Sequence, residues 1–304
     1  MRWRPSRTVQ VEDRRGSGGM GGLGGTRMGG LGGGGMALPV GGGLGGIVLI
    51  IIVFVVMNLL GGTGNGAPTG GIQGGQGGVI GSLAPSDDQG QFINSVTVDV
   101  QAFWDEYFRA NGRGDYPETT LVLFSGTTQS GCGLASSETG PFYCPADGKV
   151  FLDGEFFDQL HQRFGASGDF AEAYVIAHEF GHYVQDVLGT MDQVAAEQQS
   201  NPGEANDLSI RLELQADCYA GMWAHDVWAS PDQSEVELID EADVLEAIKA
   251  AEAVGDDRIQ QQATGTINKE SWTHGSADQR AKWFNTGFKQ GTLESCDTFA
   301  AATP

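Results

Sequence analysis

The sequence is short of basic residues. Lys and Arg together number 17 in 304 residues, against 39 Asp and Glu, and the formal net charge at pH 7 is −22. Because nucleic-acid phosphates are bound by basic surfaces, this charge argues against a nucleic-acid partner. The acidic excess is instead typical of a solvated, soluble surface. Histidine is also scarce, with five residues in all, so histidines that lie close together are informative.

Cysteine is limited to Cys132, Cys144, Cys218 and Cys296. An even number of cysteines in a translocated domain indicates two disulfides. Cys132 and Cys144 are close in sequence and flank a Gly- and Ser-rich loop, so we expect them to pair. That pairing leaves Cys218 with Cys296. The sequence alone does not fix the connectivity, and four free, buried thiols are the alternative.

The one apolar run, Ile47 to Leu60, is shorter than the about 18 residues expected of a full membrane span. It lies, however, in an uncharged stretch from Met28 to Ser86, and Gly is tolerated in spanning helices. Arginines precede the run and nearly all the acid follows it, which predicts a membrane anchor with a cytoplasmic N-terminus and an extracytoplasmic domain. A cleaved signal peptide would have a shorter N-terminal region. A buried core helix could not pack between Gly-rich tracts.

Gly-rich, low-complexity tracts flank this run. Such tracts cannot bury enough surface to offset their backbone entropy, so we expect them to be flexible. The roughly 215 residues that remain suit one compact domain. We therefore predict a disordered cytoplasmic tail, a transmembrane helix, a Gly-rich linker and one folded domain, at 1–40, 41–62, 63–88 and 89–304.

The folded part predicts an α+β domain, because strand signals come early and helical signals come late. Apolar residues at helical spacing mark Phe92 to Arg109 as a helix. Two β-branched or apolar runs mark strands, and four further helices follow. The predicted strands are 119–124 and 149–152, and the predicted later helices are 170–188, 207–228, 239–254 and 276–288.

The central motif is His178-Glu179-Phe180-Gly181-His182. Residues four apart share one face of a helix, so the two imidazoles can bind one zinc ion. Glu179 follows the first ligand and is placed to take a proton from a water activated by the metal. The alternative is a pair of helical histidines packed against the core.

A catalytic zinc needs a third protein ligand and one open position. The next predicted helix carries Glu213 and Asp217, again one turn apart. Glu213 is suited as the third ligand, and Asp217 could accept a hydrogen bond from a ligand histidine and fix its tautomer. A solvent-facing acidic pair is the alternative. Cys218 would suit zinc as a thiolate, but it points about 100° away from Asp217 on an ideal helix, which favours a disulfide.

Several segments carry a family resemblance: MRWR, GPFYCPAD, HEFGHYVQ, LSIRLELQADCYAG and THGSADQRAKWF. HEFGH followed by ELQAD looks like the glutamate-zincin arrangement, in which ExxxD supplies a zinc ligand and an orienting Asp. The whole chain resembles the putative neutral zinc metallopeptidase family of bacterial single-span membrane proteins. The resemblance covers the N-terminal tip and nearly all of the domain after about residue 90. It implies a zincin-like domain, a small sheet plus several helices, with His178, His182 and Glu213 as Zn²⁺ ligands and Glu179 as the base.

His274 is a further candidate, in Trp272-Thr273-His274-Gly275 with Arg280 following. This segment is similar to the THP…R segment of CAAX-prenyl-protease-like peptidases, although Gly275 replaces the Pro. A late histidine can hydrogen-bond the developing oxyanion. The alternative is a structural histidine near a helix cap. Two other residues are weaker candidates. His225 is more typical of a surface residue, and Tyr183 is more typical of an aromatic residue that is buried on a helix.

The sequence therefore predicts a membrane-anchored zinc endopeptidase that hydrolyses peptide bonds with a water activated by Glu179. The alternative is a membrane-tethered zinc-binding scaffold or regulatory protein without proteolytic activity, which would have no use for that carboxylate. Lys149 to Asp153 is a candidate edge strand for an extended substrate, with a core strand as the alternative. Thr190 to Ala205 is a polar segment that reads as a surface loop or a lid.

Overall fold

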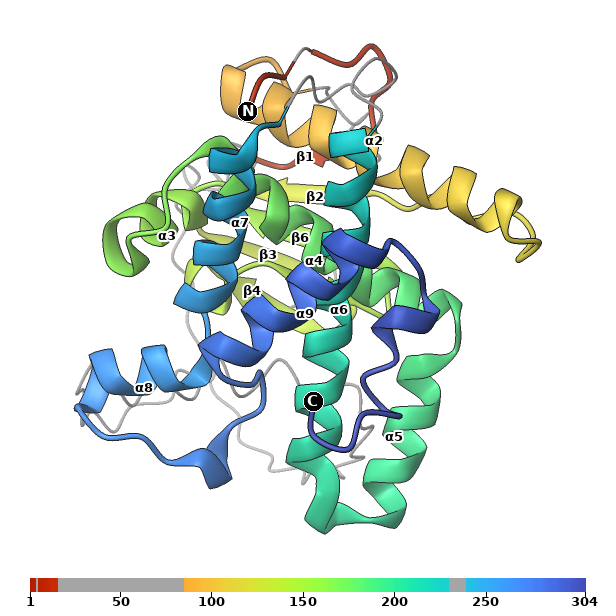
Figure 1. Ribbon diagram of the computed structural model, residues 1–304. Helices are drawn as coiled ribbons and strands as arrows, with labels where there is room; N and C mark the ends of the chain where they lie inside the picture. Colours follow the sequence, from red (N-terminus) through yellow and green to blue (C-terminus); the bar gives the residue numbers. More distant parts are fainter. Residues whose placement is uncertain (4, 16–84, 230–238) are drawn as a thin grey trace, which may run out of the picture.

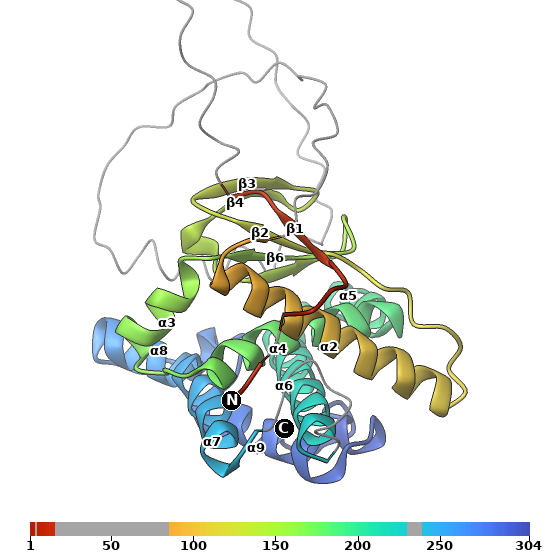
Figure 2. The ribbon, with the colours of Figure 1, turned by 90° about the horizontal axis from the view of Figure 1, so that it is seen from above.

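A computed structural model describes residues 1–3, 5–15, 85–229 and 239–304. The expected α+β class is confirmed, with small sheets on one side of the molecule and helices on the other (Figures 1 and 2). The strands are β1 (Val11–Asp13), β2 (Leu121–Phe124), β3 (Thr127–Ser130), β4 (Gly133–Ser136), β5 (Phe142–Cys144) and β6 (Lys149–Asp153). The helices within the described ranges are α2 (Asp88–Ala110), α3 (Phe156–Phe164), α4 (Asp169–Val187), α5 (Thr190–Ser200), α6 (Ala205–Ala229), α7 (Glu241–Ala253), α8 (Asp256–Thr264) and α9 (Ala277–Gln290).

The main sheet has the strand order β1-β2-β6-β5. β1 and β6 run parallel to β2, and β5 runs antiparallel to β6. Strand β6 is therefore an inner strand, and the expectation that it receives a substrate at a free edge is wrong. Both of its sides already carry ladder hydrogen bonds. Among the described strands, β1 and β5 form the two edges of this sheet.

The two faces of the main sheet contact different layers because alternate side chains point to opposite faces of a strand. Leu121 and Leu123 of β2 join the large core shared with the helices, whereas Val122 and Phe124 join a smaller cluster on the other face. That smaller cluster includes Ala135 of the antiparallel hairpin β3–β4. Figure 2 shows this hairpin on the side of the sheet away from the helices.

Helix α4 lies at the centre of the helical layer and contacts β5 and β6 on one side and α6 and α7 on the other. Helices α6 and α9 cross closely because glycines stand at their contact. A Cβ on Gly287 would clash with the carbonyl oxygen of Cys218, and one on Gly221 would clash with that of Phe284. The absence of side chains at these two positions lets α9 pack directly on the helix that carries Glu213.

Residues 1–3 and 5–15 pack on the folded domain, although they fall within the disordered tail expected for 1–40. Val11 of β1 is 2% exposed. The backbone N–H of Gln10 donates to the Asn94 side chain, whose amide donates in turn to the carbonyl of Thr8. The α-amino group of Met1 lies 2.5 Å from a carboxylate oxygen of Asp243 in α7. These pairings depend on residues far away in the chain, which local composition does not reveal.

The predicted membrane span, Ile47 to Leu60, lies outside the described residues. Among the helices of the described ranges, none is long and apolar enough to cross a bilayer. Most of the predicted Gly-rich linker also falls outside these ranges.

Two disulfides join the four cysteines. Cys132 pairs with Cys144, and Cys218 pairs with Cys296, the connectivity that the spacing favoured. The first bond ties the loop between β3 and β4 to strand β5. The second ties the middle of α6 to the segment that follows α9. The alternative of four free thiols is therefore wrong.

Candidate metal centre

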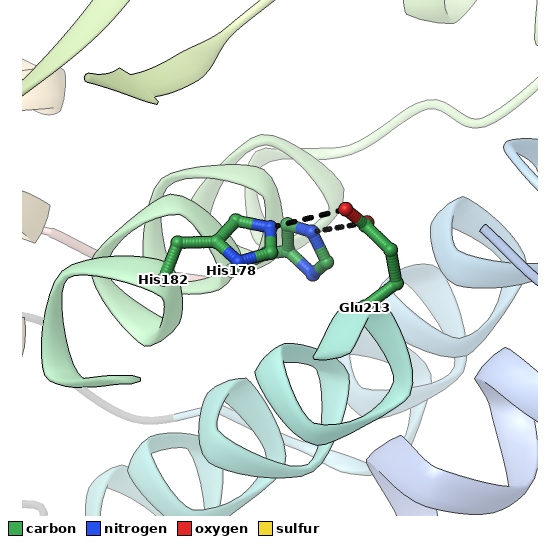
Figure 3. Close-up of side chains that lie close together, drawn as sticks. All are labelled: His178, His182 and Glu213. Atoms are coloured by element: carbon green, nitrogen blue, oxygen red, sulfur yellow. Dashed lines mark ion pairs between the residues drawn. The ribbon is translucent and has the colours of Figure 1, made fainter. Parts of the chain in front are cut away.

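Helix α4 presents two histidines towards α6. It begins with Asp169 and ends before Gly189, whose left-handed backbone (φ +74°) stops the helix. His178 and His182 lie one turn apart on the face of α4 that meets α6, and Glu213 faces them from α6 (Figure 3). The Nε2 atoms of the two histidines lie 3.3 and 3.4 Å from the two oxygens of Glu213.

The close approach of the two helices depends on the glycine of the HEFGH motif. A Cβ built on Gly181 would lie 3.0 Å from the carbonyl oxygen of Ala216 and 3.1 Å from its Cα. Any side chain there would push α6 away from α4. Since Glu213 lies one turn before Ala216, we infer that Gly181 sets the distance between the carboxylate and the two imidazoles.

Three buried ligand atoms lie close enough to hold one metal ion. A ligand atom from each of His178, His182 and Glu213 falls within 4.8 Å of the other two. Burial alone would raise the pKa of Glu213, but His182 and His178 hold it well below its usual range, so the carboxylate is ionised. Two imidazoles and one carboxylate form a donor set that suits zinc and leaves a fourth position open. The residues present therefore fit the metal that the motif implies.

Glu179 is a buried carboxylate beside this set. Its residue is 8% exposed, and within the described residues its Oε2 atom has no hydrogen-bond partner. Buried polar atoms are nearly always paired, so an unpaired carboxylate oxygen indicates a site that water or a substrate completes. Burial raises the pKa of Glu179, against the opposing charges of His178 and His182. A raised pKa brings the carboxylate closer to the range in which it can take and return a proton near neutral pH.

Asp217 holds the first histidine. One of its oxygens lies 2.8 Å from Nδ1 of His178 and accepts from the Tyr174 hydroxyl at 2.5 Å. Arg280, from α9, donates to both oxygens, at 2.8 and 2.9 Å. Burial raises the pKa of Asp217, but Arg280 and His178 bring it below its ordinary value. With Nδ1–H donated to an ionised carboxylate, Nε2 is the nitrogen through which the neutral His178 ring can bind a metal ion.

Gln185 holds the second histidine. Its Oε1 lies 2.9 Å from Nδ1 of His182, and its Nε2 donates to the carbonyl of Leu212 and to Oε1 of Gln215. Since the amide nitrogen already faces two acceptors, the oxygen must face His182 and accept its Nδ1–H. Gln185 was not among the residues predicted from the sequence, although its place three residues after His182 puts it on the same helix face.

His274 lies beside the metal centre on the loop before α9. Its Nδ1 lies 3.2 Å from an Asp256 oxygen, and the other Asp256 oxygen accepts from the backbone N–H groups of residues 273, 274 and 275. Burial lowers the pKa of His274, but Asp256 and the nearby charge of Glu213 raise it above its ordinary value. Asp256, at the start of α8, was also missed, because nothing in its local sequence links it to a residue 18 positions away.

The remaining candidates have structural partners. Nδ1 of His225 lies 2.6 Å from the carbonyl of Phe288, and the hydroxyl of Tyr183 donates to the carbonyl of Pro117. Cys218 is bound in a disulfide, so it is not a thiolate ligand. The polar segment read as a loop or lid forms α5, with Val194 buried.

Comparison with known proteins agrees with this geometry. A family model described as "Putative neutral zinc metallopeptidase" matches residues 1–299. The chain is 40% identical to the uncharacterized protein YpfJ of Escherichia coli (strain K12), over 98% of this chain and 99% of that protein. It is 50% identical to the uncharacterized protein Rv2575 of Mycobacterium tuberculosis (strain ATCC 25618 / H37Rv), over 62% of this chain and 64% of that protein. No solved structure matches the chain.

Proposed function

Since the chain belongs to the putative neutral zinc metallopeptidase family, we propose that it is a zinc-dependent endopeptidase. His178, His182 and Glu213 would hold the metal, and Glu179 would be the general base. The observation that carries this proposal is the unpaired, buried Oε2 of Glu179 beside the three ligand atoms. A purely structural zinc site requires ligands but no free carboxylate next to them.

The residues around the site would have different roles in hydrolysis. Zinc, when bound, supplies Lewis-acid activation of a water and of the peptide carbonyl. Glu179 takes the proton of the attacking water and returns it to the leaving amine, for which a raised pKa is suited. Asp217 and Gln185 keep the ligand histidines in the tautomer with Nε2 towards the centre.

In this proposal His274 would stabilise the oxyanion of the tetrahedral intermediate. Its Nδ1 lies 3.2 Å from an Asp256 oxygen. Burial lowers the pKa of His274, but Asp256 and Glu213 raise it above its ordinary value, which favours the doubly protonated ring, whose Nε2–H can donate as well. The charge of Glu213 is among the causes that raise the pKa of His274, which supports a role for this ring at the ligand set. A fixed donor aimed at a developing negative charge is typically worth about 10²- to 10³-fold in rate.

We further propose that the domain works outside the cytoplasm and is associated with the membrane through residues 47–60. The two disulfides support an oxidising compartment. Strand β1 pairs with β2, and paired strands lie about 4.8 Å apart, whereas a bilayer core is about 30 Å thick. This pairing supports an N-terminal strand in the same compartment as the domain, whereas the arginines predict a cytoplasmic N-terminus.

The test compares the full-length protein with its Glu179→Gln variant on a library of peptides, with cleavage read by mass spectrometry. We expect the zinc-loaded wild type to cut a subset of peptides and Glu179→Gln to leave them intact with its zinc retained. Glu172→Gln is the matched control, because Glu172 is another shielded carboxylate of α4 but contacts His161 instead of the centre. It should cut the same peptides.

Two results would count against the proposal. Equal cleavage by wild type and Glu179→Gln would exclude Glu179 as the base. Absence of cleavage by zinc-loaded wild type across the library would favour the scaffold or regulatory function.

A further inference from the structure

The two disulfides stand in different relations to the metal centre. Cys144 belongs to the small cluster between the main sheet and the β3–β4 hairpin. Cys218 and Cys296 belong instead to the large core, and both are fully buried. Cys218 follows Asp217 on α6, so the second disulfide lies next to the residues that orient the ligand histidines.

A chain of buried hydrogen bonds connects this disulfide to a ligand. The carbonyl oxygen of Cys296 accepts from Nε2 of Gln215 at 3.1 Å. Oε1 of Gln215 accepts from Nε2 of Gln185 at 3.1 Å. Oε1 of Gln185 lies 2.9 Å from Nδ1 of His182. Each link joins groups that are shielded from water, where a hydrogen bond is stronger and its loss more costly.

The carbonyl at the start of this chain fixes its direction. A backbone carbonyl can only accept, so Gln215 must turn its NH₂ group towards Cys296 and its oxygen towards Gln185. Gln185 must then turn its NH₂ group towards Gln215 and its oxygen towards His182. His182 therefore carries a proton on Nδ1, which leaves Nε2 as the nitrogen with the lone pair in the neutral ring. This tautomer is the one that can bind zinc through Nε2.

Other contacts hold the C-terminal segment to the domain without the disulfide. Arg211 of α6 donates to the carbonyls of Thr298 and Ala301, and the hydroxyl of Thr298 donates to the carbonyl of Arg211. The Cys296 carbonyl also accepts from the backbone N–H of Thr298 at 2.9 Å. Breaking the disulfide should thus loosen the position of this carbonyl while the segment stays attached. Its effect on the metal centre should be local.

We propose that the Cys218–Cys296 disulfide positions the Cys296 carbonyl, and through Gln215 and Gln185 holds His182 in its zinc-binding tautomer. Zinc is then bound more tightly by the oxidised chain than by the reduced chain. This inference rests on the proposed function in one respect, that His178, His182 and Glu213 bind zinc. Gln215 and Gln185 act as positioning residues, since neither touches the metal or the substrate.

The expected size of the effect follows from the remaining contacts. Removing the direct partner of a ligand histidine typically costs about 10- to 100-fold in metal affinity. Here the Leu212 carbonyl still accepts from Gln185 at 2.7 Å when Gln215 is lost. Because one of the two anchors of Gln185 survives, we expect a weaker effect, a loss of about 3- to 10-fold in zinc affinity.

The experiment measures the zinc dissociation constant of the full-length protein by competition with a chromophoric chelator. Cys218→Ala/Cys296→Ala and the fully oxidised Gln215→Leu should each bind zinc about 3- to 10-fold more weakly than wild type. Cys132→Ala/Cys144→Ala, the matched control, should bind like wild type. The triple variant Cys218→Ala/Cys296→Ala/Gln215→Leu should be no weaker than Gln215→Leu, because changes along one chain of contacts do not add.

Several results would overturn the inference. Equal losses of zinc affinity in the two double-cysteine variants would indicate a general loss of stability. Losses of zinc affinity that add up in the triple variant would show that the disulfide and Gln215 act independently. If Cys218→Ala/Cys296→Ala does not fold, wild-type affinity in oxidised Gln215→Leu alone excludes the connection. Failure of wild type to bind zinc is a different outcome, since it would refute the proposed function itself.

Discussion

Replacing Arg280 with methionine should destabilise the protein by about 3–5 kcal/mol at neutral pH, the usual cost of removing one partner of a buried ion pair. Asp217, which Arg280 contacts through both carboxylate oxygens, is completely buried. Methionine keeps much of the volume but leaves that carboxylate charged in the protein interior. The hydroxyl of Tyr174 and Nδ1 of His178 remain as partners, so we expect the lower end of the range.

The pH dependence follows from the same contacts. In wild type, burial raises the pKa of Asp217 while Arg280 and His178 bring it below its ordinary value. The ion pair therefore stabilises the protein above the unfolded pKa of about 3.9, and this stability is lost as the pH falls through the folded pKa. Without Arg280, burial raises the folded pKa, so the variant is penalised increasingly above about pH 4. The difference between the two proteins grows with pH.

The assay is urea unfolding of the metal-free, full-length protein at pH 5 and pH 8. Arg109→Met is the matched control, because Arg109 pairs with Asp105 on an exposed helix face. Such a pair is worth about 0.5 kcal/mol or less. A loss for Arg280→Met as small as the control at pH 8, or a larger loss at pH 5 than at pH 8, would refute the reasoning.

Three further predictions concern other parts of the molecule. Burial, reinforced by nearby aspartates, raises the pKa of Glu172 to about 8. An acid whose pKa is higher in the folded than in the unfolded protein costs stability as the pH rises from its unfolded pKa. Glu172→Gln should therefore raise the melting temperature more at pH 8 than at pH 5. An equal difference at both pH values would contradict this burial effect. His274→Ala should lower kcat by about 10²- to 10³-fold with zinc retained, and an unchanged kcat would exclude an oxyanion contact. Arg7→Cys and Asp278→Cys, both at exposed positions, should be labelled from the same side of the membrane by an impermeant maleimide. Labelling of only one of them in intact spheroplasts would contradict the shared compartment.

The helices of the metal centre were predictable because their signals are local. Each of the six segments expected as helices or strands from apolar spacing after residue 119 overlaps a helix or strand of the structure. His178, Glu179 and His182 fall within five consecutive residues, and Glu213 and Asp217 are one turn apart. Helical periodicity alone therefore places each group on one face.

Other elements were missed because they depend on distant partners. Strand β1 has three residues and pairs with β2 more than 100 positions away, so no local alternation marks it. Strand β3, with the sequence TTQS, lacks the apolar alternation of a half-buried strand. Helix α5 buries little besides Val194, and its polar composition reads as a loop.

The residues that orient the side chains of the site also include some that local sequence reveals and some that it does not. Gln185 could have been found from its helical spacing to His182. Asp256 and the carbonyl of Cys296 could not, since they reach His274 and Gln215 only through tertiary packing. A backbone carbonyl also carries no signal in the sequence.

The central claim is that His178, His182 and Glu213 bind zinc beside a free Glu179. Elemental analysis of the purified, folded, full-length protein tests it most directly. We predict about one zinc per chain in wild type and in Glu179→Gln, and a large loss of zinc in Glu213→Ala. Wild type without zinc, or Glu213→Ala with its zinc intact, would contradict the account.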